Sequence, residues 1–162
     1  MRLRNVKNAR EIVSNHNLVV TKNPFDNFKP LHIEIGTGKG DFIIGKAKLH
    51  PEINFIGIEK YESVLIRALN KVEDIPENLR FMCFDAIKIT DYFNNNVDQI
   101  YLNFSDPWPK KKHSKRRLTS PIFLDLYNQI SKDNINIKMK TDNKGLFAYS
   151  LETLNNNNFH FN

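Results

Sequence analysis

The chain has 162 residues, of which 40% are hydrophobic, a size that supports one domain with a buried core and is small for two. Its 24 Lys and Arg residues outnumber its 18 Asp and Glu residues, and the net charge of +6 favours a polyanionic partner over an acidic small molecule. The single cysteine, Cys83, excludes an intramolecular disulfide, so we expect a cytoplasmic protein. No apolar run has the length of a signal peptide or of a membrane span.

Residues 1–30 are basic and polar, and they predict an arm that leads into a domain over residues 31–162. From Leu31 onward, short runs rich in Ile, Leu, Val, Phe and Tyr alternate with patterns of helical spacing. The predicted strands cover residues 31–35, 54–59, 79–84, 97–104 and 136–141. Helical apolar faces are predicted within residues 64–72, 122–130 and 146–154. This alternation is typical of a doubly wound α/β fold with a mostly parallel sheet.

Local signals refine the second half of the chain. Ser120 and Pro121 predict a helix start, with the serine hydroxyl as the cap and the proline at the first helical position. The asparagine runs at 94–96 and 155–158 predict loops. Only four residues follow the second run, so we expect the C-terminal strand pair of the sheet to be incomplete.

The segment EIGTGKG, residues 34–40, lies where the first predicted strand meets the first helix, at the edge where open parallel sheets bind ligands. Gly36, Gly38 and Gly40 allow the backbone to turn tightly and to approach a ligand closely. Asp41 stands where the dinucleotide fingerprint needs its third glycine, and Glu34 would repel a pyrophosphate. A sulfonium amino acid carries a cationic amino group that suits this acid. The loop therefore favours S-adenosylmethionine over a dinucleotide.

Two further carboxylates follow predicted strands at the same edge. Glu59 ends the second strand, where a carboxylate can accept hydrogen bonds from both hydroxyls of a ribose. This placement supports an adenosine-bearing ligand, but dehydrogenases and methyltransferases share it. Asp85 lies just past the third strand and either faces the adenine or caps the next helix.

The fourth predicted strand runs into residues 103–109, NFSDPWP, again at the carboxyl edge. Pro107 and Pro109 restrict the backbone on both sides of Trp108. A rigid acid, Asp106, beside an aromatic ring is suited to orienting and stacking a planar base. The alternative is a purely structural turn. The glycine loop at the same sheet edge favours the functional interpretation.

A basic cluster, residues 110–117, follows at once and carries six formal positive charges in eight residues. This density favours a phosphate backbone as the partner, although charge runs are usually solvated loops. His113 has no partner acid in the motif, so we expect it to face RNA or solvent and to bind no metal. Asp142, after the fifth strand, either caps the next helix, as Asn143 also could, or shares the substrate pocket with Asp106.

These residues resemble one family, the bacterial tRNA (guanine-N7)-methyltransferases of the TrmB type. The resemblance runs through IEIGTGKG, GIEKYESV, NFSDPWPKKKHSKRRLTSPIFLDLY and KTDNKGLF, and so covers essentially the whole chain. It implies a Rossmann-like class I methyltransferase fold, S-adenosylmethionine as cofactor and the guanosine at tRNA position 46, in the variable loop, as substrate. Family members continue through a final strand pair and a Thr-x-x-Glu-type substrate motif, which we expect to be missing here.

Residue roles follow from the same resemblance. It implies that the S-adenosylmethionine site is lined by Glu34, Glu59, Asp85 and Asp106. Contacts with the substrate base are implied for Lys110 and Asp142. Contacts with RNA are implied for Lys112, His113, Ser114, Lys115, Arg116 and Arg117.

Guanine N7 already offers an unprotonated lone pair, so methylation there needs no general base. Rate enhancement would come from aligning N7 with the methyl group and from electrostatics. Asp106, with Asp142, is therefore expected to accept hydrogen bonds from the N1–H and amino group of the base. Two alternatives stay open: an amino-methyltransferase on adenine or cytosine, and a catalytically impaired, RNA-binding member of the family. The sequence does not distinguish a monomer from a homodimer.

Overall fold

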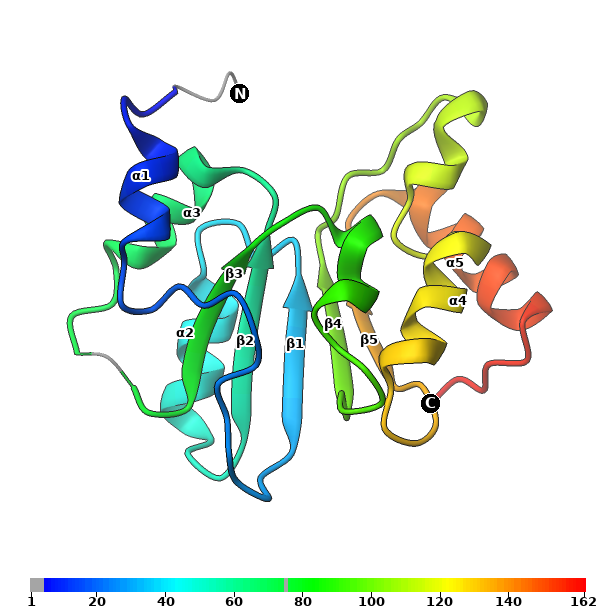
Figure 1. Ribbon diagram of the computed structural model, residues 1–162. Helices are drawn as coiled ribbons and strands as arrows, with labels where there is room; N and C mark the ends of the chain where they lie inside the picture. Colours follow the sequence, from blue (N-terminus) through cyan, green and yellow to red (C-terminus); the bar gives the residue numbers. More distant parts are fainter. Residues whose placement is uncertain (1–4, 75) are drawn as a thin grey trace.

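A five-stranded sheet between two layers of helices forms the protein, as a computed structural model of residues 5–74 and 76–162 shows (Figure 1). The strands are β1 (Leu31–Ile35), β2 (Asn54–Glu59), β3 (Leu79–Cys83), β4 (Gln99–Asn103) and β5 (Ile137–Lys140). The α-helices are α1 (Ala9–Ser14), α2 (Asp41–Leu49), α3 (Glu62–Leu69), α4 (Pro121–Ile130) and α5 (Lys144–Asn156). Two 3₁₀ helices complete the set, η1 (Ala86–Asp91) and η2 (Lys111–Arg116).

The sheet is parallel throughout and has the strand order β3-β2-β1-β4-β5. The chain moves outwards from β1 to β3 and then returns to the other side of β1, so the order reverses between β1 and β4. The loops that follow these two strands diverge and leave a crevice at the carboxyl edge. All five strands point towards the top of Figure 1, where these loops gather. The doubly wound fold predicted from the sequence is confirmed.

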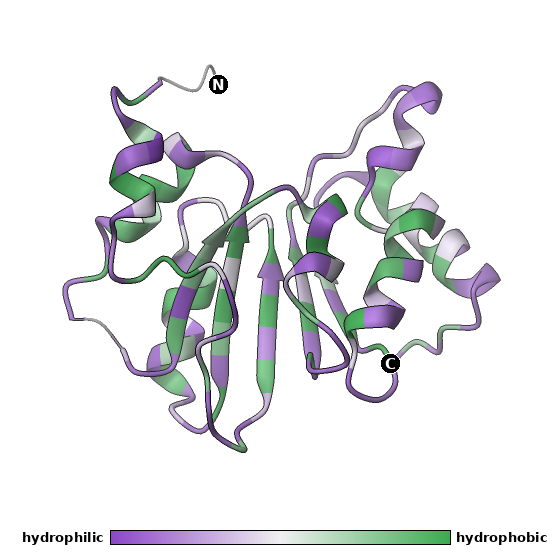
Figure 2. Ribbon diagram, in the orientation of Figure 1, coloured by the Kyte–Doolittle hydropathy of each residue, from purple (hydrophilic) through white to green (hydrophobic). Residues whose placement is uncertain are grey.

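Apolar side chains from alternate strand positions fill a core on each face of the sheet. On one face Ile33, Ile56 and Ile100 are buried together with residues of α4 and α5. On the other face Phe55 and Phe81 are buried together with residues of α1, α2 and α3. Figure 2 shows the apolar residues concentrated in the strands and on the helix sides that meet them.

The residues before β1 pack against the outer edge of the sheet. Val13 of α1 and Leu18 are buried, and α1 lies against α3. The Phe81 N–H donates to the Leu18 carbonyl at 2.8 Å, and the Val20 N–H donates to the Phe81 carbonyl at 2.9 Å. This segment therefore covers part of the free edge of β3, which would otherwise expose unpaired backbone groups. Residues 1–4 of the predicted arm lie outside the described residues.

The predicted elements differ from the observed ones mainly at their ends. Three strands are one to three residues shorter than predicted, namely β3, β4 and β5. Pro121 occupies the first turn of α4 as predicted, but the Ser120 hydroxyl makes no capping bond. It donates instead to the Lys115 carbonyl at 3.0 Å, so the predicted serine cap is wrong. The buried hydroxyl is therefore hydrogen-bonded to a carbonyl of the preceding turn and not to an N–H of the helix.

The helices are short, and α5 is the longest of those described, with 13 residues. A helix needs about 20 apolar residues to cross a bilayer. Within the described ranges no helix is long and apolar enough for this. After α5, residues 157–162 form no strand, and β5 is an edge strand of the described sheet.

The contact between α2 and α3 provides a test of the fold. Gly40 has a φ of 77°, and a Cβ there would approach the Ala68 Cβ to 2.8 Å. We expect Gly40→Ala to lower the free energy of unfolding by about 1–3 kcal/mol, because both the backbone conformation and the close contact oppose a side chain. Urea unfolding beside the wild type measures this loss.

Gly45→Ala is the matched control, because Gly45 lies inside α2 and a Cβ there would meet no atom within 4 Å. This substitution should raise the free energy of unfolding by about 0.5–1 kcal/mol, since alanine is the better helix former. Equal losses in the two variants would contradict the tight contact at Gly40.

Candidate functional site

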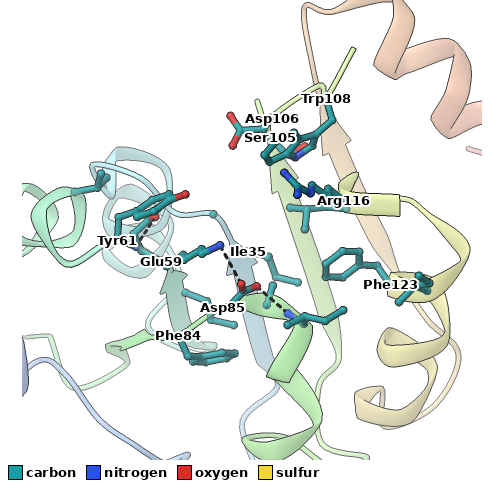
Figure 3. A pocket seen from close by; sticks show the side chains of 18 of the residues that line it. Ile35, Glu59, Tyr61, Phe84, Asp85, Ser105, Asp106, Trp108, Arg116 and Phe123 are labelled. Atoms are coloured by element: carbon teal, nitrogen blue, oxygen red, sulfur yellow. Dashed lines mark hydrogen bonds and ion pairs between the residues drawn. The ribbon is translucent and has the colours of Figure 1, made fainter. Parts of the chain in front are cut away.

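Two adjoining cavities lie among the loops at the carboxyl edge of the sheet. The larger, of about 850 Å³, is lined by residues at or just after the ends of β2, β3 and β4, including Glu59, Asp85 and Asp106 (Figure 3). The smaller, of about 480 Å³, lies over the glycine loop. Gly36 and Phe104 line both cavities, so one ligand could occupy the two together.

The glycine loop lines the smaller cavity with a left-handed backbone. Gly36, Gly38 and Gly40 have φ values of 76°, 58° and 77°, which side-chain-bearing residues rarely adopt. A Cβ at Gly36 or Gly38 would meet no protein atom within 4 Å. Packing within the protein therefore does not require these two glycines. The backbone conformation requires them, and the open space above them is available to a ligand.

Glu59 holds the glycine loop against the end of β2. One carboxylate oxygen accepts a hydrogen bond from the Gly38 N–H at 2.9 Å, and the other accepts one from the Tyr61 N–H at 3.2 Å. The residue is buried, yet its carboxylate reaches the larger cavity. An ionised carboxylate has about four lone-pair directions, so Glu59 can still accept hydrogen bonds from a ligand diol.

Glu34 is a buried acid beneath the glycine loop. Its two oxygens accept hydrogen bonds from the Thr37 hydroxyl at 2.7 Å and from the Asn103 amide at 3.2 Å. Burial raises the pKa of Glu34 to about 7, against the lowering effect of these two donors, and the nearby Glu59 adds to the rise. A carboxyl group in this state can become fully ionised when a cationic group binds beside it.

Asp85 both caps a helix and lines a cavity. It caps η1, because the Ile87 N–H donates to its carboxylate at 3.2 Å, and it also lines the larger cavity. Lys60 forms an ion pair with it at 3.0 Å. Burial alone would raise the pKa of Asp85, but the hydrogen bonds and charge of Lys60 and the Ile87 N–H outweigh it and lower the pKa.

The loop after β4 forms the opposite wall of the larger cavity, where Asp106 is exposed (Figure 3). Its backbone is left-handed at Phe104 and Trp108, with φ values of 52° and 42°. The second value is unusual, because a residue before proline favours an extended backbone. The Arg116 guanidinium lies 4.9 Å from the centroid of the Trp108 ring, and the His113 ring packs nearly perpendicular to the Trp108 ring, with 5.8 Å between the ring centroids.

The basic cluster lies at the rim of the larger cavity and forms η2, the yellow-green turn at the upper right of Figure 1. Lys115 and Arg116 line the cavity, while Lys110 and Lys112 are exposed beside it. Figure 2 shows η2 as predominantly hydrophilic. Arg117 differs from these residues, because its guanidinium donates hydrogen bonds to two carbonyls of the protein.

Asp142 follows β5 at the same edge of the sheet. The Phe104 N–H donates to the Lys140 carbonyl at 2.8 Å and so ties the loop after β4 to the end of β5. The cap of α5 is Asn143, which accepts a hydrogen bond from the Leu146 N–H at 2.8 Å. Asp142 itself is exposed and, among the described residues, does not belong to the lining of either cavity.

Comparison with known proteins agrees with this geometry. The model of a family described as "Putative methyltransferase" matches residues 28–162. The chain is 47% identical to the tRNA (guanine-N(7)-)-methyltransferase of Staphylococcus carnosus, over 99% of this chain and 82% of that protein. The chain belongs to the tRNA (guanine-N(7)-)-methyltransferase family.

Solved structures show the same fold at low sequence identity. An antibiotic-related methyltransferase has a TM-score of 0.61 at 21% identity, over 83% of this chain and 71% of that one. A 16S rRNA (adenine(1408)-N(1))-methyltransferase from Catenulisporales acidiphilia, solved with the cosubstrate SAM, has a TM-score of 0.55 at 14% identity, over 68% of this chain and 55% of that one. The class I methyltransferase fold expected from the sequence is therefore confirmed.

In this tRNA (guanine-N(7)-)-methyltransferase family member, most of the predicted site residues meet at one sheet edge. Sequence reasoning missed the residues that hold the acids in place, which are Thr37 and Asn103 at Glu34 and Lys60 at Asp85. The partners of Glu34 could have been predicted from the sequence. A buried acid needs hydrogen-bond donors, and a threonine and an asparagine stand in the adjoining loops.

Glu34 gives the ligand-free protein a specific pH dependence of stability. Folding raises its pKa from 4.5 to about 7, so between these values the folded state holds a proton that the unfolded state has released. The free energy of unfolding therefore falls as the pH rises through this window. We expect Glu34→Gln to remove this decline, by up to about 3 kcal/mol, as measured by urea unfolding from about pH 4.5 to 7.5.

His32 has an opposite effect that must be separated from that of Glu34. Burial lowers the pKa of His32 to about 4, so its contribution to stability rises with pH between about 4 and 6.5. This contribution is present in both proteins and cancels in their difference. If the free energy of unfolding of wild type and of Glu34→Gln changed in parallel with pH, the raised pKa of the Glu34 carboxyl would be contradicted.

Proposed function

We propose that the chain transfers the methyl group of S-adenosylmethionine to N7 of a guanosine in tRNA, at position 46 of the variable loop. The observation that carries this proposal is the arrangement of acids around the larger cavity. Glu59 and Asp85 stand on one side of it, and Asp106 and Trp108 stand on the other (Figure 3). A cofactor and a planar base held by these two walls would meet between them.

The residues of the two cavities fit S-adenosylmethionine. When bound, this cofactor supplies an electrophilic methyl group on a sulfonium. Glu59 would accept hydrogen bonds from the ribose hydroxyls, and Asp85 would lie beside the adenine. Glu34 lines the smaller cavity below the open space at Gly36 and Gly38, where it would meet the cationic amino group. Ionisation of Glu34 on binding would then favour the cation over a phosphate.

Asp106 would act by orienting the base. Its carboxylate is exposed at the larger cavity and would accept hydrogen bonds from the guanine N1–H and amino group. N7 is already unprotonated, so the protein has only to align its lone pair with the methyl group. Asp142 and Lys110 lie outside the cavity lining, and we propose that they contact the tRNA around the target nucleotide.

The rim of the larger cavity would bind the phosphate backbone. Lys112, Lys115 and Arg116 are exposed there. Their positive charges release counterions when they neutralise phosphates, which makes binding strongly dependent on salt. His113 and Ser114 lie in the same turn and would extend this contact.

Methyl transfer to unmodified tRNA tests the proposed function. With radiolabelled S-adenosylmethionine, we expect label in tRNA with guanosine at position 46 and none in tRNA with adenosine there. Reductive chain cleavage should then cut the labelled strand at that nucleotide, because N7-methylguanosine is susceptible and an amino-methylated base is not. Equal labelling of the two tRNAs would overturn the assignment, and labelled but uncleavable RNA would point to an amino-methyltransferase.

The orienting role of Asp106 has its own test. We expect Asp106→Ala to slow single-turnover methylation of saturating tRNA by about 10²-fold or more, because the base loses its alignment with the methyl group. Asp125→Ala is the matched control, since Asp125 is an exposed acid on α4, outside both cavities. An unchanged rate in Asp106→Ala would exclude this role.

A further inference from the structure

Arg117 ends the basic cluster, but its side chain turns away from the rim. Its Nε donates a hydrogen bond to the Pro107 carbonyl at 3.0 Å, and its Nη2 donates one to the Trp108 carbonyl at 3.0 Å. The guanidinium also lies 4.4 Å from the centroid of the Tyr149 ring, which belongs to α5. The side chain therefore connects the loop that carries Asp106 to a helix of the scaffold.

The loop held in this way has a backbone that needs support. Trp108 has a φ of 42° and precedes a proline, a combination that persists only where the surroundings fix it. Two consecutive carbonyls of this loop converge on one planar guanidinium. This fork geometry fixes the orientation of both peptide groups, which a lysine ammonium could not match.

The segment that carries Arg117 is itself firmly held. The Ser120 and Tyr127 hydroxyls donate to carbonyls of residues 115 and 118, at 3.0 and 2.8 Å. The Thr119 and Ser150 hydroxyls share a buried hydrogen bond of 2.7 Å, which ties the segment to α5. All four of these residues are buried. The guanidinium thus projects from a rigid turn.

Arg116 and Arg117 are neighbours in the chain but have different surroundings. Arg116 is exposed, lies over the face of the Trp108 ring and lines the larger cavity. Arg117 is half-buried, and its hydrogen bonds go to the backbone of the same loop. Nε and Nη2 of Arg117 are therefore engaged by the loop backbone, whereas the exposed Arg116 guanidinium at the cavity is available to a phosphate.

We propose that Arg117 is a positioning residue for methyl transfer and does not contact RNA phosphates. It fixes the loop of Asp106 and Trp108 against α5, so that the acid keeps its place at the cavity. This role rests on the proposed methylation of tRNA. It also separates Arg117 from the other basic residues of the cluster, for which RNA contact is expected.

Trp108 is the only tryptophan of the chain, so its fluorescence reports on this loop directly. We expect Arg117→Met and Arg117→Lys to shift the emission maximum to longer wavelength and to increase quenching by acrylamide, because the loop loses its anchor. Tyr149→Leu should change the emission in the same direction but less. Circular dichroism and S-adenosylmethionine binding by calorimetry show that each variant is folded.

The salt dependence of tRNA binding separates positioning from phosphate contact. Lys112→Met is the matched control, because Lys112 is an exposed member of the same cluster. We expect this control to reduce the slope of log K against log salt by about 0.7–0.9, the loss of one phosphate contact. Arg117→Met should leave the slope unchanged.

The kinetic constants provide the third measurement. Arg117→Lys retains the charge but loses the fork, so we expect kcat to fall by about 10²-fold with little change in the KM for tRNA. Lys112→Met should raise the KM and leave kcat near the wild-type value.

A reduced salt slope in Arg117→Met together with unchanged Trp108 fluorescence would overturn the positioning role. If the wild type transfers no methyl group, the proposed function fails, while the fluorescence and the salt slope still decide the role of Arg117.

Discussion

The hydrogen bond between the Gly38 N–H and the Glu59 carboxylate joins the ends of the two strands on which the site is built. β1 delivers the glycine loop, and β2 delivers the acid that holds it, in parallel register with Glu34 opposite Gly57. The left-handed glycines give the loop its path, and Glu59 fixes it in place. Because Glu59 also reaches the larger cavity, one side chain both shapes the site and is available to bind within it.

The acids at this edge differ in environment, and these differences suit the separate roles that we propose for them. Glu34 is buried with a raised pKa, which suits an acid that becomes ionised beside a bound cation. Asp85 is paired with Lys60 and has a lowered pKa, so it keeps its charge at the mouth of the cavity. Asp106 is exposed on the opposite wall. In the proposed function, acidic residues would serve cofactor binding on one wall and base orientation on the other.

The sequence predicts the central framework well, for identifiable physical reasons. Continuous apolar runs that alternate with glycine-rich and acid-containing turns predict buried parallel strands. Since the strands end where these runs end, the sequence also places Gly36 and Glu59 at the ends of two strands. The side-chain hydrogen bonds to backbone carbonyls were not predictable. The Ser120 hydroxyl donates to the Lys115 carbonyl and does not cap α4. The left-handed Trp108 offers its carbonyl to Arg117, whose guanidinium packs on Tyr149 of α5.

A crystal structure of the chain with S-adenosylhomocysteine would test the architecture of the site most directly. We predict the adenosine in the larger cavity with its ribose hydroxyls on Glu59, the amino group of the homocysteine next to Glu34, and the sulfur facing the loop of Asp106. Density for the ligand away from Glu59 and the glycine loop, or a sulfur turned away from Asp106, would contradict a single site shared by cofactor and base.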